Sequence, residues 1–400
     1  MARVYHAMAD TGSFSTQVKR ILGLDISDAA LSQRSQSIGE ELLLEAFHAS
    51  VAPIAEPAAH PEAFYKGWRL TAMDGSVFDL RNTEPIGREA VKIPDKNGNP
   101  PAFAHLRAVV LVELGMRQPL AVQLDWQAKG EVTLARRMLA ETKLPEKSLL
   151  LADRLFGAPW LVWELDRLGA GYLLRVKKNL KVKKLETLAD GSFLVSVSVV
   201  DPKTRRKLGE VLLREIRASV RFEGGKQPME LRLWTSLLDA RKHPALELAE
   251  LYSQRWGEEV FFGELKSQFL GSANLLDSQT PRTAAQEVVA MLFAASILAS
   301  QRCAVAERAG VRTTRISFAQ VHEQTLALCR FFVLSRELLS PAERVELTRR
   351  LLDELAQTAV IQKRKPRSCK RAVRQPSKNW PKMKEPSSKP LVKSISIPNP

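Results

Sequence analysis

Two aspartates, Asp74 and Asp153, each follow a short apolar run that predicts a buried β-strand. The runs are residues 70–73 and 149–152, and we expect each strand to stop at its aspartate. In an open α/β sheet, ligands bind in the crevice outside the ends of the strands. A buried ionised carboxylate is costly unless it is paired, hydrogen-bonded or bound to a metal. Taken singly, each aspartate could equally cap a turn, but the pair indicates a cation site.

A helix predicted to begin at Pro244 and to run to about residue 270 supplies a third carboxylate. At about 100° per residue, four of its side chains fall on one stripe about 60° wide: Tyr252, Arg255, Glu259 and Lys266. Two further acids, Glu258 and Glu264, lie off this stripe and are weaker candidates. The alternative is a solvated helix face, because Arg255 and Glu259 are an i, i+4 pair of opposite charges.

Asp74, Asp153 and Glu259 form a set of hard oxygen donors that contains no histidine or cysteine. Such a set favours Mg²⁺ or Mn²⁺ over zinc and leaves room for water and phosphate oxygens. Two ions roughly 4 Å apart can activate a nucleophile and stabilise the leaving oxygen of a phosphodiester. The tyrosine, arginine and lysine of the same stripe would then hold a phosphate backbone.

The charge of the chain favours a polyanionic partner. Its 400 residues include 60 Lys and Arg against 44 Asp and Glu, which gives a net charge of +16 and a pI near 9.9. Residues 363–400 carry +11 and residues 171–235 carry +8, so the remainder is close to neutral. Two basic regions on a neutral scaffold indicate nucleic acid, the alternative being a role in solubility alone.

The cysteines and the apolar runs exclude other classes of protein. Cys303, Cys329 and Cys369 have neither metal-ligand spacing nor an even count, which argues against a zinc site or a disulfide framework and favours a reducing cytoplasm. The longest apolar run, residues 288–299, is too short to span a bilayer, and no cleavable hydrophobic segment is seen near residue 1. We therefore expect no membrane association.

Hydrophobic periodicity predicts an α/β protein with a mixed sheet covered by helices. Buried strands are expected at residues 68–73, 108–114, 120–124 and 148–152, and helices at 131–141 and 161–168. Between residues 171 and 238 the pattern changes to strict alternation separated by turn residues, which predicts an antiparallel β insertion. Helices are expected again at 318–338 and 341–357, followed by a disordered basic tail.

The residues around the three acids resemble the motifs of the DDE transposases. Residues 73–76 (Met-Asp-Gly-Ser) and 152–156 (Ala-Asp-Arg-Leu-Phe) are similar to the first and second acidic motifs of that family. Residues 252–266 carry Tyr-x2-Arg-x3-Glu-x6-Lys, the signature of the insertion-sequence-four family, and the wider similarity runs from about residue 30 to 370.

The resemblance implies a bacterial insertion-sequence transposase with a ribonuclease-H-like mixed sheet. Asp74, Asp153 and Glu259 would be both metal ligands and catalytic residues, and would hold two Mg²⁺ or Mn²⁺ ions. The expected partners are double-stranded DNA, as the terminal inverted repeats of the element and as target DNA, and a second copy of the chain in the DNA complex. The expected location is the bacterial cytoplasm, in association with the nucleoid.

The chain divides into six predicted parts. They are a helical N-terminal DNA-binding region of reduced size at 1–66, the two parts of the catalytic core at 67–170 and 239–310, the basic β insertion between them at 171–238, C-terminal helices at 311–362 and the disordered tail at 363–400.

Several alternatives stay open. A catalytically inactive or domesticated DNA-binding protein derived from a transposase and a metal-dependent DNA nuclease are the rival functions, and the intact acids argue against loss of chemistry. DNA contacts are expected from Tyr252, Arg255, Lys266, Arg154 and Trp234. The Trp234 ring either stacks on an extruded base or packs in the core. Glu131 is either structural or approaches the metals.

Overall fold

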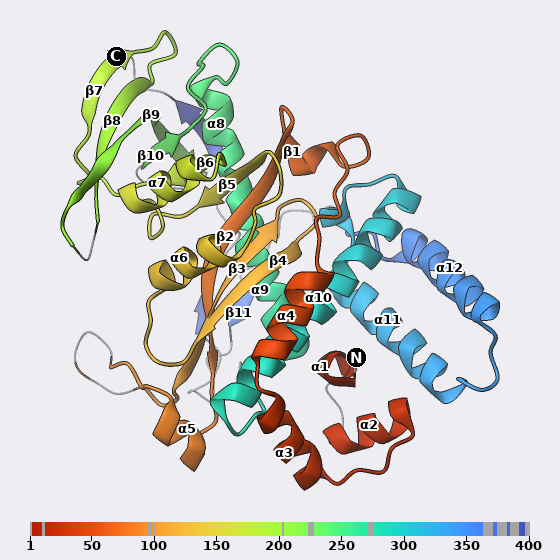
Figure 1. The fold of residues 1–400 in the computed structure, drawn as a ribbon. Coiled ribbons are helices and arrows are strands. Elements are labelled where there is room, and N and C mark those ends of the chain that lie inside the picture. The colour runs from red at the N-terminus through yellow and green to blue at the C-terminus, as the bar shows by residue number, and fades with distance from the viewer. Residues whose placement is uncertain are drawn as a thin grey trace.

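The computed structural model describes residues 2–9, 13–94, 98, 101–201, 204–222, 228–270 and 275–362, and the strands at 371–373, 382–384 and 392–396. One large mixed sheet runs through the molecule in the order β4-β3-β2-β5-β6-β10-β9-β8-β7. Helices cover both faces of its first half, and further helices from both ends of the chain pack beside it (Figure 1).

Five strands form the core of the sheet: β2 (Trp68–Asp79), β3 (His105–Glu113), β4 (Gln118–Asp125), β5 (Ser148–Ala152) and β6 (Gly171–Arg175). The first three make an antiparallel meander, β5 pairs in parallel with β2, and β6 pairs in parallel with β5. Helices α6 (Glu131–Glu141) and α7 (Pro159–Arg167) precede β5 and β6. A three-stranded meander followed by two parallel strands is the ribonuclease-H-like arrangement, which confirms the predicted fold class.

Strand β2 does not stop at Asp74, as the sequence predicted, but continues to Asp79. Strand β3 pairs with β2 from Thr71 to Asp79 and so supports the longer strand, whereas pairing with β5 ends where Met73 meets Ala152. Asp74 therefore lies inside a strand and at the same time just past the end of its parallel neighbour. The apolar run located Asp74 at the end of the pairing with β5, but it did not show that β2 itself continues.

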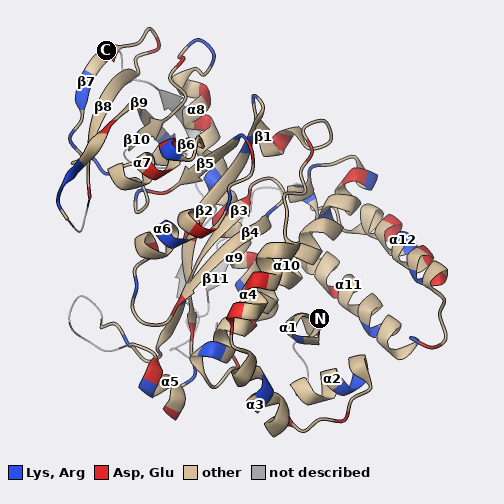
Figure 2. Ribbon diagram, viewed as in Figure 1, with Lys and Arg blue, Asp and Glu red and all other residues tan. Residues whose placement is uncertain are grey.

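The predicted β insertion is present but is not a separate sheet. It consists of β7 (Lys183–Thr187), β8 (Phe193–Val200), β9 (Lys207–Phe222) and β10 (Met229–Thr235), all paired antiparallel. Because β10 also pairs with β6, the insertion continues the core sheet, and the antiparallel part begins only after β6. Lys and Arg lie along β7 at the outer edge (Figure 2).

Successive residues of β2 and β5 point to opposite faces of the sheet. Met73, Leu150 and Ala152 pack on one face in the same cluster as residues of α6 and α7. Leu70, Ala72, Leu149 and Leu151 pack on the other face with α8 (Ala245–Tyr252). Residues 74 and 153 have the parity of this second face, so the helices after residue 244 are the ones that meet them.

The single helix predicted from Pro244 to about residue 270 is interrupted. α8 ends at Tyr252, a 3₁₀ turn covers Ser253–Arg255, and α9 spans Trp256–Phe269. The 3₁₀ turn winds more tightly than an α-helix. It therefore rotates the side chains of α9 relative to a helical wheel drawn at about 100° per residue. The stripe predicted from that wheel was therefore only approximate.

Helix α10 (Pro281–Ala309) is longer than its apolar run suggested. Its 29 residues are long and apolar enough to cross a membrane, but 67% of its most apolar window is buried inside the protein. Residues from α1, α4, α9, α11 and α12 pack around it in one cluster. It is the central core helix of this half of the molecule.

The regions before the core and directly after α10 are helical, as predicted. The N-terminal part contains α1 (Ala2–Ala9), α2 (Phe14–Leu22), α3 (Asp28–Ile38) and α4 (Glu41–Ser50), and the C-terminal part contains α11 (Phe318–Leu334) and α12 (Pro341–Thr358). The predicted disordered tail lies for the most part outside the described residues and stays a prediction. Three short strands are described there: Arg371–Val373, Lys382–Lys384 and Val392–Ser396, the last paired with β9.

Candidate active site

Asp74 and Asp153 are neighbours at the end of β5. The residues just before them, Met73 and Ala152, are paired in parallel register, and adjacent strands lie about 4.8 Å apart. Asp74 Oδ1 accepts a hydrogen bond from the N–H of Gly75 (2.8 Å), and Asp153 Oδ1 accepts one from the N–H of Leu155 (2.7 Å). Each carboxylate thus has one oxygen bound to a local N–H, and the second oxygen of Asp74 faces Arg255.

The surroundings of Asp74 hold excess negative charge. Burial raises the pKa of its carboxyl to about 6, and the Gly75 N–H partly opposes that shift. The charges of Asp153 and Glu131 raise the pKa further, whereas Arg255 lowers it. A carboxyl with these neighbours is suited to bind a cation, because a nearby positive charge would offset the repulsion from Asp153 and Glu131.

Arg255 brings Glu259 to the same place. One terminal nitrogen of its guanidinium donates to Glu259 Oε1 (2.7 Å), and the other lies 3.6 Å from Asp74 Oδ2. The side chain of Glu259 is 37% exposed, and that of Arg255 is 15% exposed. The three acids predicted from the sequence therefore converge, and the predicted Arg255–Glu259 pair is present as well.

The other two residues of the stripe face the sheet and not bulk solvent. Tyr252 is buried, and its hydroxyl donates to the carbonyl of Ala152 (3.4 Å), next to Asp153. Burial raises the pKa of Tyr252 to about 12. Lys266 Nζ donates to the carbonyl of Val77 (2.7 Å), so it lies three residues further along β2 than Asp74. Burial lowers the pKa of Lys266.

Glu131, at the start of α6, contacts the site from the other face of the sheet. A Cβ atom placed on Gly75 would lie 2.4 Å from the carboxyl carbon of Glu131, so the Glu131 side chain lies directly against the backbone next to Asp74. Arg107 Nε lies 3.8 Å from the Glu131 carboxylate. Burial raises the pKa of Glu131, Arg107 lowers it and Asp153 raises it. Glu131 therefore lies near the acids and is paired with Arg107, and its approach to the metals stays a prediction.

Glu258 is the acid that the sequence placed off the stripe and that the structure places in the site. It is fully buried in the first turn of α9. Burial raises its pKa well above the ordinary value, the charges of Asp74 and Asp153 raise it further, and Arg255 and the Asp74 N–H lower it. The sequence signal was the adjacent acidic pair, Glu258 and Glu259, but a constant wheel could not tell which of the two points inward.

Trp234 does not have the predicted DNA-stacking position. The ring is fully buried, and its Nε1–H donates to Glu215 Oε2 (3.0 Å). The packing alternative is therefore correct, because β10 is an interior strand whose residues alternate between two covered faces. Arg154, by contrast, is exposed directly beside Asp153.

A basic cavity of about 910 Å³ begins at Arg154 and extends over the insertion. Its basic lining residues are Arg154, Arg175, Lys177, Lys178, Arg217 and Arg232. The buried Glu215 carboxylate holds two of them, accepting from Arg217 Nε (2.8 Å) and from Arg232 Nε (2.8 Å) and Nη2 (2.6 Å). The cavity wall is thus fixed by a buried ion-pair network and presents the remaining charge to solvent.

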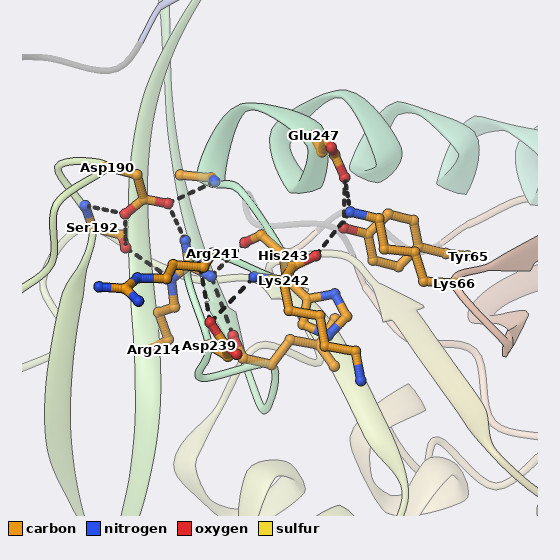
Figure 3. Close-up of polar contacts among 12 residues, drawn as sticks. Tyr65, Lys66, Asp190, Ser192, Arg214, Asp239, Arg241, Lys242, His243 and Glu247 are labelled. Atoms are coloured by element: carbon orange, nitrogen blue, oxygen red, sulfur yellow. Dashed lines mark hydrogen bonds and ion pairs between the residues drawn. The ribbon is translucent and has the colours of Figure 1, made fainter.

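The insertion also anchors the helix that leads to Arg255 and Glu259. Asp190 Oδ2 accepts from the N–H of Ala245, the first residue of α8 (2.8 Å), and is paired with Arg214 (Figure 3). Arg214 is fully buried and also donates to Ser192 Oγ (2.8 Å) and to the carbonyl of His243 (2.6 Å). A turn of the insertion therefore fixes where α8 begins.

A second group of ligand-type side chains lies away from the site. His60, Cys303 and Glu307 have ligand atoms within 4.8 Å of one another, the one such group that involves three or more residues within the described ranges. His60 Nδ1 accepts from the N–H of Glu56 (3.1 Å), so Nε2 carries the proton and points at Cys303 Sγ (3.1 Å). A metal-bound Nε2 would need the opposite tautomer. This group is a buried polar network.

A family model for the transposase DDE domain matches residues 66–297 of this chain. The chain belongs to the DDE transposase family. It is similar to transposase InsG for insertion sequence element IS4 of Escherichia coli (strain K12), with 24% identity over 363 residues that cover 89% of this chain and 78% of the relative. This DDE transposase is therefore an insertion-sequence enzyme of the kind that the signature indicated.

Among solved structures, the transposase is similar to a chain in the piggyBac transposase synaptic complex with hairpin DNA. The TM-score is 0.39 at 10% sequence identity, and the match covers 75% of this chain and 59% of that one.

Proposed function

We propose that this DDE transposase cleaves the terminal inverted repeats of its element and joins them to target DNA at a site formed by Asp74, Asp153 and Glu259. The observation that carries the proposal is the convergence of these acids. The register of β2 and β5 sets the two aspartates side by side, and one Arg255 guanidinium contacts both Asp74 and Glu259.

The donor set fits two Mg²⁺ or Mn²⁺ ions. Its ligand atoms are carboxylate oxygens, which these hard ions prefer, and burial together with the charge of Asp153 raises the pKa of Asp74. When bound, such ions lower the pKa of an attacking water or hydroxyl and stabilise the leaving oxygen of a phosphodiester. Asp74, Asp153 and Glu259 would hold them. The residues that pack with α8 on the same face of the sheet would keep these carboxylates in position.

The basic residues of the site would bind the DNA backbone. Arg255 presents a planar fork that suits a phosphate, and it contacts both Asp74 and Glu259. Tyr252 and Lys266 flank it along the end of β5 and along β2. The cavity that begins at Arg154 would take the adjoining stretch of backbone without reading its sequence, because phosphate contacts set position and not base identity.

Two further expectations belong to this proposal. A second copy of the chain would join the DNA complex, because two element ends must be held together for transfer. An enzyme that acts on chromosomal DNA would work in the cytoplasm at the nucleoid.

A supercoiled plasmid that carries marked element ends distinguishes this function from its rivals. With Mg²⁺, we expect excision at the ends followed by products in which the ends are joined to new DNA. Nicked plasmid without joined products would instead identify a nuclease, and retarded but intact plasmid would identify a DNA-binding protein without catalysis.

A further inference from the structure

Glu258 is a buried acid without a partner. Its exposed fraction is 0%, and neither carboxylate oxygen has a hydrogen-bond partner within the described part of the chain. The large majority of buried polar side-chain atoms are hydrogen-bonded, and buried charges are paired or bind metals. An unpartnered glutamate at this depth is therefore either protonated or neutralised by a bound cation.

The groups that face Glu258 make its burial harder to explain without a cation. Asp74 and Asp153 are the acids that face it, and the N–H of Asp74 is close but makes no hydrogen bond of ordinary geometry. Arg255, its nearest positive charge, is already paired with Glu259 and Asp74. The N-terminus of α9 favours negative charge only modestly. Among the described residues, no Lys or Arg forms an ion pair with Glu258.

Position separates Glu258 from its neighbour. Consecutive helix residues point about 100° apart, so the two glutamates reach the aspartates from different directions. Glu259 is partly exposed and paired with Arg255, whereas Glu258 is enclosed between α9 and the sheet. Glu131 has its own partner in Arg107. When ionised, Asp74, Asp153, Glu258 and Glu259 carry four negative charges against the single positive charge of Arg255, an excess that divalent ions would offset.

We propose that Glu258 is a fourth carboxylate ligand of the metal site and approaches it from the buried side while Glu259 approaches from the exposed side. This inference rests on the proposed function, since it requires that Asp74 and Asp153 bind divalent ions. It adds to the signature, which assigns a single glutamate at this place.

Mn²⁺ binding to the full-length protein without DNA, measured by electron paramagnetic resonance, tests this proposal independently of activity. Glu258→Gln should weaken Mn²⁺ binding by about tenfold or more, a loss of the size expected when an outer or inner ligand is removed. Glu250→Gln, an exposed glutamate on α8, is the matched control and should bind Mn²⁺ like the wild type. Glu258→Leu fills the same enclosed space without polarity and should show the same loss if Glu258→Gln folds poorly.

The outcomes separate the inference from the function on which it rests. If Asp74→Asn loses Mn²⁺ while both folded Glu258 variants bind it with wild-type affinity, Glu258 is not a ligand and only this inference is wrong. If Asp74→Asn itself binds Mn²⁺ normally, the proposed metal site is wrong and the inference is wrong with it. Loss of Mn²⁺ in Asp74→Asn and in both Glu258 variants, with Glu250→Gln unchanged, supports it.

Discussion

Arg255 and Glu259 form an ion pair of 2.7 Å between the 3₁₀ turn and the first turn of α9. The same guanidinium lies 3.6 Å from Asp74. Arg255 therefore lies between Asp74 and Glu259, two acids of the candidate site, and the pair is more than a solvated surface contact. In the absence of ions it offsets part of the repulsion among the carboxylates, and with DNA present it is placed to meet a phosphate.

Replacing Arg255 by alanine should reduce end cleavage. A charge-assisted phosphate contact contributes about 1.5–3 kcal/mol, so the rate should fall by about one to two orders of magnitude. Arg255→Lys should restore only part of the rate, because an ammonium cannot reproduce the fork geometry. Single-turnover cleavage of a labelled element end measures both variants. Wild-type cleavage by a folded Arg255→Ala protein would assign the residue a structural role alone.

Asp74→Asn should make the metal-free protein more stable at neutral pH. The pKa of the Asp74 carboxyl is about 6 in the folded protein against 3.8 for an ordinary aspartate, so the folded state binds the proton more tightly. The resulting destabilisation is absent below 3.8, grows as the pH rises and is complete above 6, where it amounts to about 3 kcal/mol. Thermal unfolding of both proteins at pH 4 and pH 7.5 should reveal a difference only at the higher pH.

Mg²⁺ should stabilise the wild type and leave Asp74→Asn unchanged. A ligand that binds only the folded state raises its stability in proportion to the logarithm of its concentration. The melting temperature of the wild type should rise with Mg²⁺ and that of Asp74→Asn should not. An equal rise in both would indicate that the ion binds elsewhere.

Asp190→Ala should destabilise the protein strongly. It leaves the fully buried Arg214 without its carboxylate and removes the acceptor of the α8 N-terminus, a type of loss that costs about 3–5 kcal/mol. Adding Arg214→Met removes the unpaired charge and should recover much of the stability. Urea unfolding of the single and double variants measures this, and additive losses would mean that the two side chains do not act as a pair.

Lys177→Ala with Lys178→Ala should weaken binding to all DNA sequences alike. Both residues are exposed in the basic cavity. Each lost phosphate contact should reduce the slope of log affinity against log salt by about 0.9. Lys143→Ala, an exposed lysine outside the cavity, is the control. A loss confined to element ends would show that these lysines read sequence.

Removal of residues 363–400 tests the tail in the same way. Because it carries +11, its loss should flatten the salt dependence and lower affinity for every duplex. Selective loss of binding to element ends would instead assign base recognition to the tail.

The sequence predicted the sheet, the two aspartates and the insertion, because each depends on local patterns of apolar residues. It could not predict that β2 extends to Asp79, since that length depends on pairing with β3, a strand that begins 26 residues later. It also could not orient Glu258 and Glu259, because the 3₁₀ turn at Ser253–Arg255 changes the rotation of α9. The position of Trp234 could not be predicted for a similar reason. Alternation of apolar and polar residues predicted its strand but not which faces of that strand are covered.

Cleavage of a labelled duplex that carries one element end, by wild type and by Asp153→Asn, tests the metal-dependent active site, with DNA binding measured in parallel. Both proteins should bind the end with similar affinity. Only the wild type should cut it, and only when Mg²⁺ or Mn²⁺ is present. Cleavage by Asp153→Asn at the wild-type rate, or cleavage by the wild type in the presence of excess chelator, would contradict the assignment of Asp153 to a metal-dependent active site.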